Sequence, residues 1–368
     1  MRMTNLPRDL VEKILSRVPV KTIPAVRSTC KNWNLISKDE RFANKHIENA
    51  ATAAAREKEF LMITTGDTMV YLVRFNLYET CNKNFDVSIN RTCISIPREH
   101  LQFSDETLVR SQVLVSSGLL ICVWRNIKSK LLVWNPYWGK PRWIDCPTMY
   151  CSYERFAFGY DTSCGRHKIL RFSSDKPNRH VEIYDLSFDS WRTVDAPSRR
   201  NIIEYIVPGL SLKGNTYWYA RDSESRYGLS CFDFTRERFG PHLPLPPCSY
   251  SNYYAVSLSS VKEEKLAVLF ASMYPSLGLD IWVTNKIEPY EVSWSKFFRV
   301  EARQHIDHCV KSGHFFIDEE KKVVVVFDRH NNAWVISGES GHFRKVDLRQ
   351  YSEAFDLVGC YVPSSVQT

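Results

Sequence analysis

The chain has 368 residues, of which 44% are hydrophobic and 24% are charged, a composition typical of globular proteins and not of disordered ones. It has no apolar run of about 18 residues, so we expect no membrane-spanning helix. Acidic residues and a proline interrupt the start of the chain, which argues against a secretory signal peptide. Eleven scattered cysteines in such a chain predict free thiols and a cytoplasmic or nuclear location.

The net charge of +8 is concentrated near the N-terminus. The first 50 residues hold ten Lys/Arg and five Asp/Glu, whereas the remaining 318 hold 39 and 36. This local excess predicts an acidic partner for the N-terminal segment. Because the chain has no block of consecutive basic residues, we do not expect that partner to be nucleic acid.

The first 18 residues predict a short helix with a broad apolar surface. Pro7 suits the first turn of a helix, and Pro19 ends it. Between them apolar residues recur at three- and four-residue steps, as expected for a helix that buries one side. These residues are Leu6, Leu10, Val11, Ile14, Leu15 and Val18.

Two further helices are predicted downstream. The second carries an apolar stripe from Ile23 to Ile36 that includes Val26, Cys30 and Trp33, and the third begins near residue 42 and continues into an alanine-rich stretch. Two short neighbours cannot cover all the apolar surface of the first helix. The surplus therefore either packs on the rest of the chain or binds another protein.

Residues 6–42 resemble an F-box over nearly their whole length. The matching features include Leu6-Pro7, Asp9-Leu10-Val11, Arg17-Val18-Pro19, Cys30-Lys31 and Trp33. The resemblance implies docking onto the small acidic Skp-family adaptor of an SCF ubiquitin ligase, and through it onto a cullin scaffold. The implied adaptor-binding residues are Leu6, Pro7, Leu10, Val11, Ile14, Leu15, Val18, Pro19, Val26, Cys30 and Trp33.

From about residue 60 the sequence predicts short strands in repeated units. Five segments each contain an apolar strand, a turn and then an aromatic residue: 131–144, 181–194, 229–243, 279–298 and 333–346. The residues that close the first strand are spaced by 50, 48, 50 and 54; they are Asn135, Asp185, Asp233, Val283 and Ser337. This period predicts a kelch-like β-propeller of about six blades, with a pair of β-sandwiches as the alternative.

The same segments resemble the F-box-associated interaction domain of a large plant family. The matching pieces include LLVWNPYWGKPRWI, EIYDLSFDSWR and GHFFIDEEKKVVVVFD. Together the two resemblances imply an α+β multidomain protein with a three-helix F-box (1–47), a helical linker (48–59), a propeller-like substrate-recognition domain (60–363) and a tail (364–368). The role implied is that of a substrate-recognition subunit of an SCF-type ligase.

No motif for catalysis or cofactor binding is present. The chain lacks a P-loop, a dinucleotide glycine run, a nucleophile elbow and paired cysteines with zinc-ligand spacing. The best metal candidate is the group His305, His308, Cys309 and His314, which we interpret as ordinary loop histidines. We therefore expect a chain that is not an enzyme and has no metal or cofactor.

Two alternatives to the ligase role remain open at this stage. One is an adaptor-binding protein that acts outside ubiquitin transfer, and the other is a propeller enzyme whose F-box controls its turnover. The expected partners are the adaptor and an unidentified target protein, with neither nucleic acid nor membrane. Aromatic and basic segments at 147–155 and 246–254 are the candidate target-binding loops.

Overall fold

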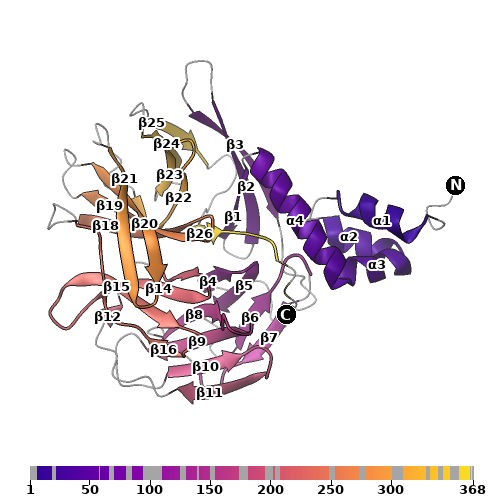
Figure 1. Cartoon of the computed structure of the whole chain (residues 1–368), viewed down its shortest axis with the longest axis horizontal. Coiled ribbons are helices and arrows are strands. Elements are labelled where there is room, and N and C mark those ends of the chain that lie inside the picture. Colours follow the sequence, from indigo (N-terminus) through magenta and orange to yellow (C-terminus); the bar gives the residue numbers. More distant parts are fainter. Residues whose placement is uncertain are drawn as a thin grey trace.

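The computed structural model of the chain begins with helices and continues with strands (Figure 1). It describes residues 6–18, 22–57, 59–65, 70–79, 85–93, 110–124, 130–138, 141–149, 154–173, 181–194, 202–203, 208–247, 253–272, 278–300, 310–328, 332–338, 343–348, 356–364 and 366. Within these ranges, no helix combines the length and hydropathy needed to cross a bilayer.

Four helices form the N-terminal part: α1 (Arg8–Leu15), α2 (Ile23–Thr29), α3 (Lys31–Lys38) and α4 (Glu40–Glu57). The predicted second helix is split because Cys30 adopts an extended backbone, with φ −159° and ψ 161°. Its Sγ accepts a hydrogen bond from the Trp33 amide and so caps the start of α3. Helix α4 is continuous through residue 57, so it includes most of the stretch predicted as a linker.

The helices enclose a small core of their own. One side of α1 contributes Val11 and Leu15, and α2, α3 and α4 contribute Val26, Ile36 and Phe42. All five are buried, and Leu6, Val18 and Trp33 pack at the edge of the cluster. This core is too small to cover every apolar residue of α1.

The remaining described residues form six sheets, here called A to F in chain order. Sheet A contains β26 (Asp356–Cys360), β1 (Glu59–Thr65), β2 (Val70–Glu79) and β3 (Phe85–Cys93), and sheet B contains β4 (Arg110–Ser116), β5 (Leu119–Trp124), β6 (Lys130–Trp134) and β7 (Pro141–Asp145). Sheet C contains β8 (Glu154–Tyr160), β9 (His167–Ser173), β10 (Val181–Asp185) and β11 (Ser190–Val194). Sheet D contains β12 (Ile202–Ile203), β13 (Leu210–Leu212), β14 (Asn215–Arg221), β15 (Tyr227–Asp233), β16 (Arg238–Phe239) and β17 (Leu243–Pro244). Sheet E contains β18 (Tyr253–Val261), β19 (Lys265–Ser272), β20 (Leu279–Glu288) and β21 (Glu291–Val300), and sheet F contains β22 (Val310–Asp318), β23 (Val323–Asp328), β24 (Asn332–Ser337) and β25 (Phe343–Asp347).

The sheets are antiparallel and stand around a common centre (Figure 1). Their inner strands contact one another in the order β26, β4, β8, β13–β14, β18 and β22, and β22 contacts β26 again. The ring is closed by the C-terminal strand, because β26 pairs with β1 and supplies the inner strand of sheet A. Closure of this kind removes the free sheet edges that invite aggregation.

Hydrophobic clusters fill the spaces between neighbouring sheets. On β23, Val324 and Val326 pack toward sheet E, whereas Val323, Val325 and Phe327 pack toward sheet A. A strand buried on both sides requires a continuous apolar run, which explains the sequence VVVVF. This arrangement confirms a helical N-terminal part followed by an all-β propeller, and it excludes the paired sandwich.

Candidate functional site

Three apolar side chains on the helical part have no partner in the helical core. Leu10 and Ile14 on α1 are 47% and 46% exposed, and Leu35 on α3 is 69% exposed. Helices α1 and α3 contact each other, so the three side chains lie on neighbouring helices of the module. We call Leu10, Ile14 and Leu35 the adaptor ridge, after the predicted role of Leu10 and Ile14; large apolar side chains left exposed are typical of interaction sites.

The structure divides the predicted adaptor-binding residues into groups. Leu10, Ile14 and Pro7 are exposed, whereas Val11, Leu15 and Val26 are buried in the helical core. Leu6, Val18, Cys30 and Trp33 are partly buried, and Pro19 lies outside the described residues. The predicted set does not include Leu35. This residue directly precedes the buried Ile36 on α3, so it points away from the helical core. Its position next to the apolar stripe from Ile23 to Ile36 was the signal in the sequence.

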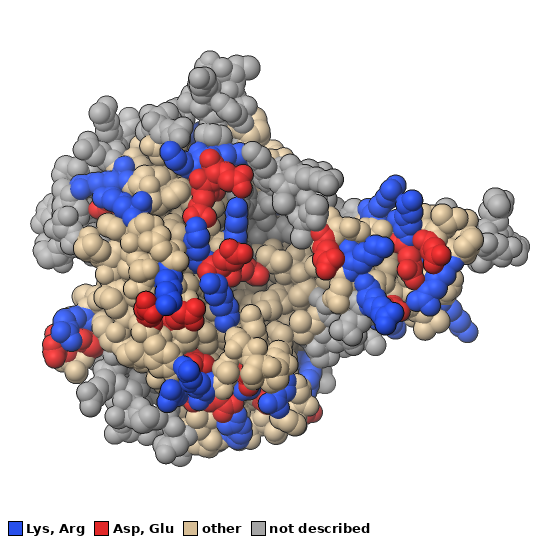
Figure 2. Space-filling view, viewed as in Figure 1, with Lys and Arg blue, Asp and Glu red and all other residues tan. Residues whose placement is uncertain are grey.

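Helix α1 also carries charged side chains that form ion pairs. Arg8 donates to Glu12 one turn further along α1 and to Asp39 at the start of α4, at 2.8 and 3.1 Å. These pairs are largely solvent-exposed, so each contributes little to stability. Figure 2 shows basic and acidic side chains interspersed on the helical part and over the side of the β domain in view.

Arg27 on α2 joins the helical part to the propeller. Its Nη1 donates to the carbonyl oxygens of Tyr137 and Trp138 in the β6–β7 turn, at 3.0 and 2.9 Å. Its Nη2 donates to the Ser37 carbonyl at 3.2 Å, and its guanidinium carbon lies 4.7 Å from the centroid of the Trp138 ring. Planar stacking combined with several donated hydrogen bonds is an arrangement that lysine cannot reproduce.

His46 on α4 reinforces this contact from the other side of Tyr137. Its Nδ1 lies 3.2 Å from the Tyr137 hydroxyl and its Nε2 lies 2.6 Å from the Val18 carbonyl. Ile23 and Ala43 close the apolar part of the interface with the Tyr137 ring, and all three are fully buried. Burial lowers the pKa of His46, which keeps this imidazole neutral between its two partners.

Residues near the C-terminus, Ser364 and Val366, hold the β6–β7 turn in place. Asn135 Oδ1 accepts a hydrogen bond from the Tyr137 amide. Its Nδ2 donates to the carbonyl oxygens of Ser364 and Val366 at 3.0 and 2.6 Å. Val366 also packs on the core between sheets B and C. Ser364 and Val366, both in the stretch predicted as a tail, therefore support the turn that receives the helices.

Residues in or beside the turns after the first and third strands link several neighbouring sheets. Arg142 donates from sheet B to the Leu186 carbonyl in sheet C at 3.0 Å, and Lys265 pairs with Glu319 between sheets E and F at 2.7 Å. We call this set of contacts the turn belt. It includes the β6–β7 turn that holds Arg27, so the helical part is attached at this belt.

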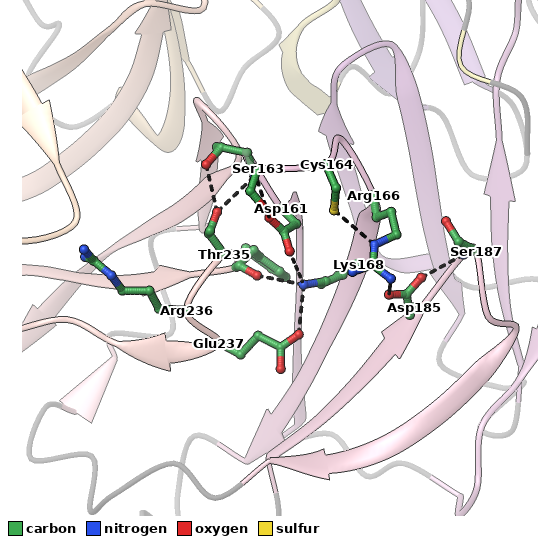
Figure 3. Close-up of polar contacts among 12 residues, drawn as sticks. Asp161, Ser163, Cys164, Arg166, Lys168, Asp185, Ser187, Thr235, Arg236 and Glu237 are labelled. Atoms are coloured by element: carbon green, nitrogen blue, oxygen red, sulfur yellow. Dashed lines mark hydrogen bonds and ion pairs between the residues drawn. The ribbon is translucent and has the colours of Figure 1, made fainter.

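Lys168 is the most buried charge in the belt, with a side chain only 3% exposed. Its Nζ lies 3.1 Å from Asp161, 2.9 Å from Glu237 and 3.1 Å from the Phe234 carbonyl, and so links sheets C and D (Figure 3). Hydrogen bonds from Ser163 and from Lys168 hold the pKa of Asp161 well below its usual range. Although burial acts to raise the pKa of Glu237, hydrogen bonds from Arg192 and Lys168 lower it. Both carboxylates therefore remain charged around the lysine.

The described residues contain no group of three or more His, Cys, Asp or Glu side chains placed to hold a metal ion. Of the predicted histidine group, His305, His308 and Cys309 lie outside the described residues, and His314 lies in β22 with its side chain undescribed. The candidate target-binding segments also lie largely outside them. Only residues 147–149, 154–155, 246–247 and 253–254 of these segments are described, and Met149 among them is 76% exposed.

An exposed apolar ridge on a helical module, attached to a closed propeller, defines a two-part interaction protein of the F-box class. The F-box domain family matches residues 3–45, and the F-box associated beta propeller domain family matches residues 61–368. Because the second match covers most of the chain, the protein belongs to the family of F-box proteins that carry an F-box associated propeller.

Plant relatives share this organisation over their full length. The chain is 44% identical to the F-box protein At3g20690 of Arabidopsis thaliana, over all of both chains. It is 41% identical to the F-box/kelch-repeat protein At3g16740 of the same plant, also over all of both chains. These matches confirm the predicted resemblance to plant F-box proteins with a kelch-like C-terminal domain.

Proposed function

We propose that this chain is the substrate-recognition subunit of an SCF-type ubiquitin ligase in the cytoplasm or nucleus. The F-box binds a Skp-family adaptor, and through it a cullin scaffold, by means of the adaptor ridge. The β domain holds a target protein. The chain itself performs no chemistry; it raises the effective concentration of the target near a ubiquitin-conjugating enzyme.

The adaptor ridge is the observation that carries this proposal. Val11 and Leu15 already satisfy the helical core, so Leu10 and Ile14 gain nothing from the fold by being apolar. Leaving two branched aliphatic side chains about half exposed is explained by a partner that buries them. The excess of basic residues in the same segment suits the acidic surface expected of that partner.

Replacement of both ridge residues on α1 tests the proposal. We expect Leu10→Ala with Ile14→Ala to weaken binding to a purified Skp-family adaptor by about thirtyfold or more, because one anchor at an interface contributes about 2 kcal/mol. Met149→Ala removes a more exposed apolar side chain from the propeller and should leave adaptor affinity unchanged. Equal affinity in the double variant and the wild type would disprove the role of the ridge.

A reconstituted ligase separates ubiquitin transfer from adaptor binding alone. With adaptor, cullin, conjugating enzyme and a co-purified target present, the wild type should promote target ubiquitination and the double variant should not. Adaptor binding without transfer to any associated protein would instead favour a role outside ubiquitin transfer.

A further inference from the structure

Exposed guanidinium groups gather at one part of the turn belt, where sheets C, D and E meet. Arg236 lies in the β15–β16 turn and Arg238 begins β16, and both are exposed. Arg192 of β11 reaches the same turn with its side chain 48% exposed. Their acidic contacts are buried by comparison: the side chains of Asp233 and Glu237 are 6% and 19% exposed. A partner approaching this place therefore meets the cations first.

An aromatic ring lies among these cations. The Tyr290 ring, in the β20–β21 turn, has the guanidinium carbons of Arg236 and Arg238 at 5.0 and 5.6 Å from its centroid. Arg238 Nε donates to the Tyr290 hydroxyl at 2.9 Å, which fixes the ring while leaving 37% of the residue exposed. We call Arg192, Arg236, Arg238 and Tyr290 the arginine–tyrosine surface. Arginine and tyrosine are the side chains most enriched at binding hot spots.

The charges linked by these contacts do not cancel. Within these contacts there are four cations, Lys168, Arg192, Arg236 and Arg238, and three carboxylates, those of Asp161, Asp233 and Glu237. Outside them, the exposed Glu288 and Glu291 flank the turn that carries Tyr290, and Glu291 is paired with Lys286. Lys168 is buried and lies between two of the carboxylates, so the surplus positive charge belongs to the exposed arginines. In Figure 3 the Arg236 side chain points away from the network around Lys168.

Hydrogen bonds within and between sheets C and D fix the turn that carries part of the arginine–tyrosine surface. The Thr162 amide donates to Thr235 Oγ1 at 2.9 Å across the boundary between sheets C and D, close to the Lys168–Glu237 ion pair. The Asp233 carboxylate accepts hydrogen bonds from the amides of Thr235 and Arg236 and so fixes the turn that carries Arg236 and leads into Arg238. Side chains mounted on fixed turns lose less conformational freedom when a partner binds.

We propose that the arginine–tyrosine surface binds an acidic segment of the target protein. The guanidinium groups donate charge-assisted hydrogen bonds to aspartate or glutamate carboxylates, and an apolar or aromatic side chain of the segment packs on Tyr290. This inference rests on the proposed role of the β domain in target binding. Because the surface and the turn that receives Arg27 both belong to the turn belt, the bound segment lies on the side of the ring where the helical part is attached.

A labelled acidic peptide provides the test. The probe is a synthetic peptide of about a dozen residues, rich in aspartate and glutamate and containing one phenylalanine, and its binding to the full-length chain is followed by fluorescence anisotropy. We expect saturable binding that weakens with salt, and a loss of about tenfold or more in the Arg236→Ala, Arg238→Ala variant. Substitution of both arginines by lysine should restore part of the affinity, because the charge returns without the fork geometry.

The matched control is Arg226→Ala. Arg226 lies in the β14–β15 turn, outside the turn belt, and its side chain is 68% exposed. Its removal should leave peptide affinity unchanged. Thermal unfolding of each variant shows that the arginine changes leave the fold intact.

Three outcomes would overturn the inference: no saturable binding of the peptide, equal affinity in the Arg236→Ala, Arg238→Ala variant, or tighter binding of single-stranded DNA of the same charge. The last outcome would identify a nucleic-acid surface. Adaptor binding, measured in parallel on the same variants, distinguishes this failure from failure of the proposed function, because it depends on Leu10 and Ile14 and not on these arginines.

Discussion

At the scale of single residues, neighbours on α1 have opposite roles. Val11 and Leu15 are buried in the helical core, whereas Leu10 and Ile14, one position before each, are exposed. A helix turns by about 100° per residue, so a one-residue step moves a side chain from the core to the edge of the apolar surface. The same kinds of apolar residue therefore build the helical core on one side of α1 and, in the proposed complex, contact the adaptor on the other.

This division predicts separable effects on stability and binding. We expect Leu15→Ala to lower the free energy of unfolding of the helical part by about 2–5 kcal/mol, because it leaves a cavity in a small core. Leu10→Ala should change stability by less than about 1 kcal/mol and should act on adaptor affinity. Thermal denaturation followed at 222 nm checks this; a larger stability loss from Leu10→Ala would show that Leu10 belongs to the core.

His167 predicts a pH dependence of stability. It lies beside the rings of Phe158 and Tyr160, and burial lowers its pKa to about 4, against about 6.5 in an unfolded chain. The folded state thus favours the neutral imidazole, so its contribution is complete above pH 6.5 and is lost as the pH falls toward 4.

We expect His167→Phe to reduce the fall in melting temperature between pH 6.5 and 4, because phenylalanine has no proton to bind. His46, whose pKa is also lowered, stays in both proteins and leaves a remaining slope of the same sign. Identical slopes in the variant and the wild type would show that His167 is protonated at no cost in the folded chain.

At the scale of secondary-structure elements, the repeated sequence unit corresponds to a defined part of each sheet. The predicted aromatic residues all lie in the fourth strand of sheets B to F; they are Trp143, Trp191, Phe239, Trp294 and Phe343. Four of the five predicted strand-closing residues end a third strand or directly follow it: Asn135, Asp185, Asp233 and Ser337. The prediction is wrong for Val283, which lies inside β20. The Oδ1 atoms of Asn135, Asp185 and Asp233 each accept a hydrogen bond from the amide of the residue two positions later. This hydrogen bond stabilises the turn after the third strand.

The closing strand β26 predicts a sharp requirement for the C-terminus. Removal of residues 356–368 takes the inner strand from sheet A and leaves β1 with an unpaired edge. We expect this truncated chain to lose its cooperative thermal unfolding and to aggregate in size-exclusion chromatography. Removal of residues 367–368 alone spares β26, Ser364 and Val366, and should leave both properties unchanged.

At the scale of the whole molecule, the helical part and the propeller share an interface built on Arg27. We expect Arg27→Ala to increase amide hydrogen exchange in α2 and α4, because the carbonyl groups of Tyr137, Trp138 and Ser37 lose their buried donor, at a cost of about 2 kcal/mol. Arg27→Lys should have nearly the same effect, since lysine cannot donate and stack as the guanidinium does.

Arg41→Ala, which removes an exposed arginine from α4, serves as the control for this prediction. Adaptor affinity should persist in the Arg27 variants, because the adaptor ridge lies elsewhere on the module. Unchanged exchange in both Arg27 variants would mean that the apolar contact of Ile23, Ala43 and Tyr137 alone holds the two parts together.

The sequence by itself determined the local features of this protein. Proline positions and apolar spacing located the helices, and the recurrence of a strand, a turn and an aromatic residue at about 50 residues indicated the propeller. The helices and the repeated strands both depend on interactions between residues near one another in the chain. Such interactions appear in the sequence as a periodic pattern. The split of the second helix at Cys30 was missed, because an extended residue inside an apolar stripe leaves no mark on the spacing.

Only the tertiary structure decided which residues meet from distant parts of the chain. The side chain of Arg27 lies on residues 137 and 138, Asn135 binds residues 364 and 366, and residues 356–360 pair with β1 to close the ring. Residues so far apart in sequence are brought together by the closure of the whole ring, and no local pattern encodes that event. The exposure of Leu35 and the meeting of Arg236 and Arg238 with Tyr290 have the same origin, since each depends on how separate elements pack.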